Sequence, residues 1–85
     1  MTDRDLRREL LALFPRLDIE VRFTNGEFEG GLIGLRGRRV LYLNPSISER
    51  RQVEMLCTLL AHEDLSHLFI LPAVRTRIES NSPGT

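Results

Sequence analysis

Several residue types are scarce or missing in this chain of 85 residues. It contains no lysine, so all 12 basic residues are arginines, and 12 acidic residues balance them to a net charge of zero. A single cysteine excludes an intrachain disulfide framework and a multi-cysteine zinc or iron–sulfur site. Hydrophobic residues make up 41% of the chain and charged residues 28%. That composition indicates a folded globular domain and excludes a disordered chain.

Long apolar runs are also missing. No stretch approaches the roughly 18 residues that a membrane-spanning helix needs. The first ten residues, MTDRDLRREL, lack the basic-then-apolar order of a signal peptide. We therefore expect a cytoplasmic protein with no membrane partner. The length predicts a single domain, which we place at residues 1–79, followed by a disordered tail at residues 80–85.

Positive charge is concentrated in the middle of the chain. Residues 30–51 carry five arginines against Glu49 alone, and the segments on either side are acidic overall. Arginine forks match the geometry of phosphate, so this stretch is a candidate ligand-binding patch. Its members are Arg36, Arg38, Arg39, Arg50 and Arg51. The chain as a whole is not basic, which disfavours nucleic acid as a partner, and the simpler interpretation is a solvated hairpin tip and first helical turn.

Three segments show the apolar spacing of helices. They are residues 3–14, 46–62 and 72–79. Thr2 or Asp3 suits the cap of the first helix, and Pro15 predicts its end near residue 14. The second helix is predicted to start with a capping box at Ser46 or with a cap at Ser48.

Three further segments predict β-strands: residues 19–24, 30–35 and 39–43. The first alternates apolar and polar residues and is followed by Asn25-Gly26, a pair that tolerates the positive φ of a type I′ hairpin turn. A two-residue turn there would pair the first two strands in antiparallel fashion and set Phe23 opposite Phe28. A second turn at residues 36–37 leads into the third strand.

The second and third predicted strands are apolar on both faces. One face carries Leu32, Leu41 and Leu43, and the other carries Ile33, Val40 and Tyr42. A sheet that is apolar on both sides must be covered on both sides, either by two layers of helices or by a second subunit. We therefore expect a homodimer whose interface is an edge strand or the face of Ile33, Val40 and Tyr42.

The apolar run Leu65–Leu71 is either a buried fourth strand or a loop that feeds the last helix. With a fourth strand, the order of elements is α-β-β-β-α-β-α. The sequence thus predicts an α+β fold, with a small antiparallel sheet of three to four strands. Two main helices and a short C-terminal helix pack against it.

One cluster invites comparison with a zinc site, namely His62, Glu63 and His67. A zincin helix carries two histidines four residues apart, which share one helix face. Here the spacing is five, which turns the two rings about 140° apart on a helix. A non-helical metal site stays open, but a helix end with solvated acids is the simpler interpretation. Cys57 lies on an apolar helix stripe, which indicates a core residue and not a nucleophile.

A short series of motifs resembles a set of small uncharacterised bacterial proteins. The shared features are the Gly30-Gly31 pair, a strand that ends at Asn44 and the Leu71–Arg75 element Leu-Pro-Ala-Val-Arg. In that set a cysteine often stands where this chain has Ile33. The resemblance covers roughly residues 28–79 and implies one compact domain, with no assigned activity to carry over.

Both polar clusters, the arginine-rich segment and the His62–His67 region, have a simple structural explanation. We therefore expect no cofactor. The leading functional hypothesis is a small non-catalytic interaction or structural module that self-associates and binds a protein partner. The first alternative is an arginine-patch binder of nucleic acid or of a phosphorylated ligand. The second is a metal-dependent enzyme that uses the His62–His67 region.

Overall fold

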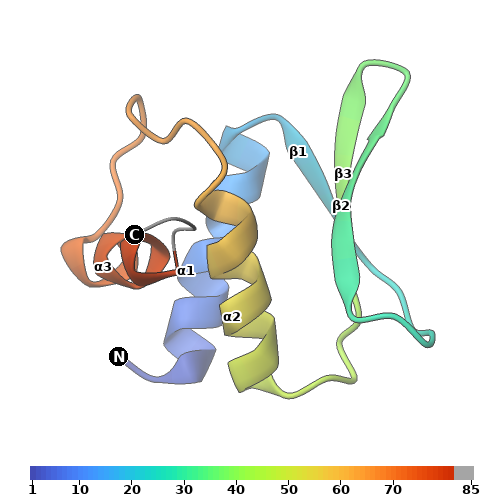
Figure 1. Ribbon diagram of the computed structural model, residues 1–85, viewed down its shortest axis with the longest axis horizontal. Coiled ribbons are helices and arrows are strands. Elements are labelled where there is room, and N and C mark those ends of the chain that lie inside the picture. Colours follow the sequence, from blue (N-terminus) through green and yellow to red (C-terminus); the bar gives the residue numbers. More distant parts are fainter. Residues whose placement is uncertain (82–85) are drawn as a thin grey trace.

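The computed structural model describes residues 1–81 and contains three helices and one three-stranded sheet. The elements are α1 (Asp3–Arg16), β1 (Ile19–Phe23), β2 (Gly30–Leu35), β3 (Arg38–Leu43), α2 (Glu49–Leu60) and α3 (Pro72–Ser80). The fold is α+β, and all three helices lie on the same side of the sheet (Figure 1). No helix in the described part of the chain is both long and apolar enough to cross a membrane.

A capping box starts α1. Thr2 Oγ1 accepts a hydrogen bond from the Asp5 backbone N–H at 3.1 Å, and the Asp5 carboxylate accepts one from the Thr2 backbone N–H at 3.2 Å. The bond from the Thr2 backbone N–H lowers the pKa of Asp5, because it stabilises the charged carboxylate, and the Thr2 hydroxyl lowers it further. The structure thus selects Thr2 from the two caps that the sequence allows.

The end of α1 differs from the prediction by two residues. The helix continues through Pro15 and ends at Arg16, so Pro15 lies in its last turn. The carbonyls of Phe14 and Pro15 accept hydrogen bonds from the two residues that follow the helix. Leu17 N–H donates to Phe14 O at 2.9 Å and Asp18 N–H donates to Pro15 O at 3.0 Å. The chain then leaves the helix at Asp18, whose φ of 61° lies in the left-handed region.

The start of α2 lies three residues later than predicted, at Glu49. Ser48 is the cap, and its Oγ accepts from the Arg51 backbone N–H at 3.1 Å. Ser46 belongs to the preceding loop, where its hydroxyl donates to Asn25 Oδ1 at 3.1 Å.

The last helix, α3, starts at Pro72, which suits a first helical position. It buries Val74 and Ile78, as the sequence predicts. Ser80 is its final residue, so the helix takes in the first residue of the segment predicted as a tail, and residues 82–85 of that segment lie outside the described residues.

The sheet is mixed, with the strand order β1-β3-β2. The predicted hairpin at Asn25-Gly26 is therefore wrong, as is the purely antiparallel sheet: β3 lies between the other two strands, parallel to β1 and antiparallel to β2. Phe23 is paired with Leu43 and not with Phe28. The physical reason is strand composition. β3 is apolar on both faces and gains most from a central position, whereas the three glycines of β2 suit an edge.

Asn44 holds the loop of residues 24–29 that crosses the end of β3. Its side-chain amide donates to Gly26 O at 3.0 Å and to Phe28 O at 2.9 Å, and its Oδ1 accepts from Ser46 N–H at 2.9 Å. Its backbone N–H donates to Glu29 O at 2.9 Å. The Asn44 side chain is itself buried, at 5% exposure, and it bonds three backbone groups that belong to the two loops around it.

The two-residue hairpin turn of the fold lies at Arg36-Gly37, between β2 and β3. Both residues have positive φ, 52° and 78°, as a type I′ turn requires. Arg36 is an unfavourable choice there, because a side chain with a Cβ costs energy in the left-handed region and asparagine tolerates that region better.

We therefore expect Arg36→Asn to raise the free energy of unfolding by about 0.5–1 kcal/mol. Urea denaturation measures the change. Arg38→Asn removes an arginine two residues away, where φ is not positive, and provides the matched control. An equal gain from both substitutions would show that charge, and not turn conformation, is responsible.

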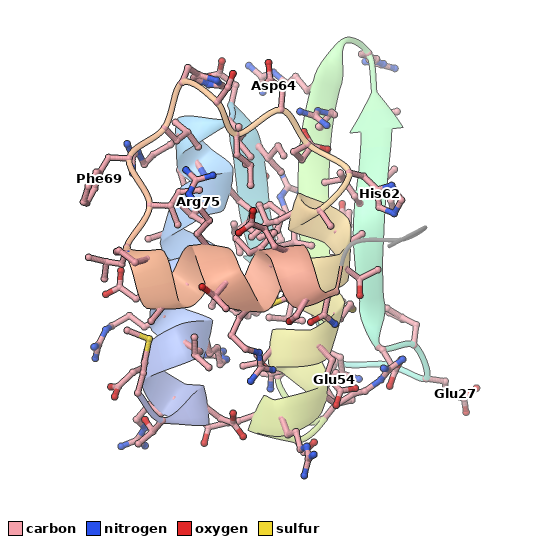
Figure 2. The ribbon with its side chains drawn as sticks, turned by 60° about the vertical axis from the view of Figure 1, so that its left-hand side comes forward. Glu27, Glu54, His62, Asp64, Phe69 and Arg75 are labelled. Atoms are coloured by element: carbon pink, nitrogen blue, oxygen red, sulfur yellow. The ribbon has the colours of Figure 1, made fainter. Side chains whose placement is uncertain are left out.

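The run Leu65–Leu71 forms no strand; it is a loop between α2 and α3. Leu68 and Ile70 are buried and join the core, while Phe69 between them is 75% exposed and points away from the molecule (Figure 2). The fourth strand is absent because this segment crosses the helical layer, where it finds no strand edge to pair with. The order of elements is therefore α-β-β-β-α-α.

The core lies between the helical layer and the inner face of the sheet. Its fully buried side chains include Leu10 and Phe14 of α1, Ile19 and Leu41 of the sheet, and several residues of α2: Val53, Leu56, Cys57 and Leu60. Val21 and Leu32 pack against this cluster from the sheet. One side of the sheet is thereby covered.

Candidate functional site

The side of the sheet that faces away from the helices is the candidate site, and we call it the outer face. Side chains alternate along a strand, so Leu41 and Leu43 of β3 are buried against the helices while Val40 and Tyr42 point outward. The strand registers then give the whole set. The outer face comprises Glu20, Arg22, Gly31, Ile33, Leu35, Arg38, Val40 and Tyr42.

The outer face has an apolar half and a charged half. The apolar half lies on β2 and β3, where Ile33 is 51% exposed and Leu35 is 63% exposed. The charged half lies on β1, where Glu20 and Arg22 form an ion pair with each other. The Glu20 carboxylate raises the pKa of Arg22 further, so this arginine stays charged. No helix of the described chain covers either half (Figure 1).

A shallow groove of about 510 Å³ runs over the apolar half. It is lined by Thr24, Phe28, Gly30, Gly31, Ile33 and Tyr42. At Gly31 a Cβ atom would meet nothing within 4 Å, so the missing side chain leaves a hollow beside Tyr42. Two residues further along the same face, Ile33 protrudes into solvent.

The sheet edge adjoins this groove. β2 is an edge strand, and it carries neither a charge nor a proline between Gly30 and Leu35. Native proteins commonly protect edge strands with such residues. The two interfaces that the sequence proposes, an edge strand and the face of Ile33, Val40 and Tyr42, are therefore neighbouring parts of one surface.

The arginines of the basic segment are partly occupied by carboxylates. Arg39 forms a two-pronged ion pair with Glu63, at 2.8 and 2.9 Å, which raises the pKa of Arg39. Arg51 forms another with Glu29, at 2.7 and 2.8 Å, and lies 3.4 Å from Glu54. The bond from Arg51 lowers the pKa of Glu29. These guanidinium groups are thus engaged within the fold.

The structure also separates the five arginines. Arg36 lies in the turn before β3 and Arg38 at the start of that strand, whereas Arg50 and Arg51 lie at the start of α2, past the other end of β3. A strand of this length spans about 17 Å. The residues therefore do not form one patch. Arg36 and Arg38 instead share a hollow of about 330 Å³ on the outer face with Arg22.

The histidine cluster is not brought together around a common centre. α2 ends at Leu60, so His62 and His67 lie in the loop that follows it, and Glu63 pairs with Arg39. Asp64 accepts hydrogen bonds from Ser66, at 2.7 Å from its hydroxyl and 3.0 Å from its backbone N–H, which lowers the pKa of Asp64. Within residues 1–81, no three His, Cys, Asp or Glu side chains converge in a way that could hold a metal ion. Figure 2 shows His62 and Asp64 on separate parts of this loop.

Cys57 is fully buried in the core, which confirms its predicted position. Burial raises the pKa of its thiol, because the thiolate would lose its hydration. We expect the native protein to react with iodoacetamide at pH 8 about 100-fold more slowly than the urea-unfolded chain. Mass spectrometry of the alkylated chain measures both rates, and equal rates would contradict this assignment.

The sequence predictions missed or misplaced two residues of the groove and one further residue of the outer face. The wrong hairpin set Phe28 opposite Phe23, whereas in the structure Phe28 lines the groove and is 44% exposed. Gly31 and Leu35 were not considered part of the outer face. Strand alternation was the available signal, since both lie two residues from Ile33.

Comparisons with protein-family models, curated proteins and solved structures give no match for this chain. The resemblance to short bacterial proteins therefore stays a prediction.

Proposed function

We propose that this chain is a non-catalytic protein-interaction module, located in the cytoplasm, that binds its partner through the outer face. The observation that carries the proposal is an apolar sheet surface with a groove and no cover within the described chain. Ile33 and Leu35 are each more than half exposed. Exposed apolar surface of this kind marks interaction sites, because binding removes it from water.

The chemistry of the polar clusters supports a non-catalytic role. Glu63 and Glu29 are engaged with arginines, and Cys57 is buried with a raised pKa. The two glutamates thus stabilise the fold through ion pairs, and Cys57 contributes to the core.

A photo-reactive residue tests the proposal directly. Benzoylphenylalanine replaces Leu35 on the outer face or, as the control, Arg50, whose exposed side chain lies on α2 away from that face. Irradiation of the native protein in its host is expected to give a discrete protein adduct from position 35 and not from position 50. No adduct at position 35, or the same adducts from both positions, would overturn the proposal.

A second candidate rests on the hollow that Arg22, Arg36 and Arg38 share beside Tyr42. Within the described residues no carboxylate pairs with Arg36 or Arg38, so the hollow offers donors to an anionic ligand such as a phosphate group. Inorganic pyrophosphate is the probe. NMR titration is expected to shift the Tyr42 resonances, with binding that weakens in salt and in Arg38→Ala. Unchanged spectra at millimolar pyrophosphate would overturn this candidate.

A further inference from the structure

The occupant that best fits the outer face is a second copy of the chain. We infer that two copies pack outer face to outer face around a two-fold axis that runs at right angles to the strands, between the levels of Val40 and Tyr42. This inference rests on the proposed function, because it names the partner of the same surface. In a two-fold contact, whenever residue i meets residue j, j also meets i. The surface must therefore be complementary to itself.

The strand registers show which residues such an axis would exchange. One level across the sheet contains Glu20, Val40 and Ile33, and the next outward level contains Arg22, Tyr42 and Gly31. The axis exchanges the two levels and places each strand over its own equivalent. Two sheets packed in this way lie about 10 Å apart, with interleaved side chains.

The exchange matches side-chain size. Ile33 of one copy lies over Gly31 of the other, which lines the groove and where a Cβ atom would meet nothing within 4 Å. Val40 likewise lies over Tyr42. Because the contact is two-fold, it occurs twice: Ile33 of each copy packs over Gly31 of the other copy. A large side chain over a glycine allows the close packing found in protein interiors.

The exchange also matches charge. Glu20 of one copy lies over Arg22 of the other, and Arg22 lies over Glu20. Each charge of the Glu20–Arg22 ion pair therefore also faces an opposite charge on the second copy. A two-fold axis parallel to the strands would instead place β1 over β2. That arrangement would set Glu20 against Ile33 and Arg22 against Gly31. The ion pair would then lose water without facing any charge on the other copy, which is unfavourable.

The same two-fold axis also exchanges the two ends of the sheet. The β2–β3 turn, with Arg36 and Leu35, would reach the loop of residues 24–29 of the second copy. That loop carries Phe28, which is 44% exposed, and Glu27, which points into solvent (Figure 2). At each end of the interface, Leu35 of one copy could therefore contact Phe28 of the other, and Arg36 could pair with Glu27.

The size of the face sets the expected strength. Three strands about 4.8 Å apart and about 17 Å long give a footprint of only about 250 Å² on each copy, which is well below that of a standard specific interface and typical of a weak contact. We therefore expect weak dimerisation, with a dissociation constant of about 100 µM, and a monomer that remains folded on dilution. Sedimentation between about 1 µM and 1 mM covers that value.

Exchanging Ile33 and Gly31 within the chain provides the decisive test. Gly31→Ile fills the hollow and Ile33→Gly removes the residue that enters it, so each alone is expected to weaken dimerisation about 10-fold or more. The double variant G31I/I33G moves both features together and, because residue 31 meets residue 33 across the axis, is expected to restore the dimer. Gly34→Ile is the matched control: it adds the same side chain to β2 in open space off the outer face. Circular dichroism checks that every variant is folded.

The outcomes separate this inference from the proposed function. Loss of dimer in both single variants, with recovery in G31I/I33G and no effect of Gly34→Ile, supports the arrangement. A wild-type dimer that the double variant fails to restore, or that Gly34→Ile disrupts, overturns it in favour of another interface such as the β2 edge. A monomer at 1 mM also overturns it. In that case an adduct of a different protein at position 35 would leave the proposed function intact.

Discussion

We expect Gly30→Ala to lower the free energy of unfolding by about 3 kcal/mol or more. Gly30 has a φ of 148°, a backbone conformation that residues with a side chain rarely adopt. A Cβ atom there would lie 2.4 Å from the Tyr42 carbonyl oxygen and 2.9 Å from Met55 Cε. The methionine side chain can move, but the Tyr42 carbonyl belongs to the central strand and cannot shift without disturbing the sheet.

Gly34→Ala is the control for this prediction. It places the same methyl group in the same strand, where a Cβ atom meets nothing within 4 Å and φ is not positive. We expect its unfolding free energy to stay within about 0.5 kcal/mol of wild type. Urea denaturation at about 1 µM protein keeps association out of the comparison. Similar losses from both substitutions would show that glycine content, and not the contact at Gly30, matters.

The second large effect is expected at Asn44. Asn44→Ala would leave the carbonyls of Gly26 and Phe28 and the N–H of Ser46 without their partner. These three hydrogen bonds are part-buried, and each contributes about 0.5–1.5 kcal/mol, so we expect a loss of about 2–3 kcal/mol in the free energy of unfolding. Asn25→Ala removes one exposed hydrogen bond of the same loop, and its expected cost is about 0.5 kcal/mol. A small effect of Asn44→Ala in urea denaturation would contradict the assigned role.

Asn44→Asp adds a pH-dependent version of this test. The aspartate keeps the acceptor for Ser46 N–H but turns a negative oxygen toward the carbonyls of Gly26 and Phe28. Burial and these carbonyls favour its neutral form, so its pKa would be higher in the folded than in the unfolded state. The folded state then binds more protons, and its stability relative to wild type is expected to rise as the pH falls from 7 to 4. A constant difference across that range would contradict this geometry.

Local patterns determined much of the fold. The helices follow from apolar spacing and from caps that act within a few residues, as at Thr2 and Ser48. The two faces of β2 and β3 follow from alternation, which correctly separated Leu41 and Leu43 from Val40 and Tyr42. The two-residue turn at 36–37 was also within reach of the sequence. In each case the deciding interactions join residues that are close along the chain.

Only the tertiary structure decided how the strands are ordered. Asn25-Gly26 is a strong local hairpin signal, but the order β1-β3-β2 places β3, which has large apolar side chains on both faces, in the centre, where it pairs on both sides. Asn44 then stabilises the loop that this order requires, through bonds to residues 16 and 18 positions earlier. The separation of the arginines and the hollow over Gly31 have the same origin. They depend on which strands are neighbours, and non-local pairing energy decides that against the preference of a single turn.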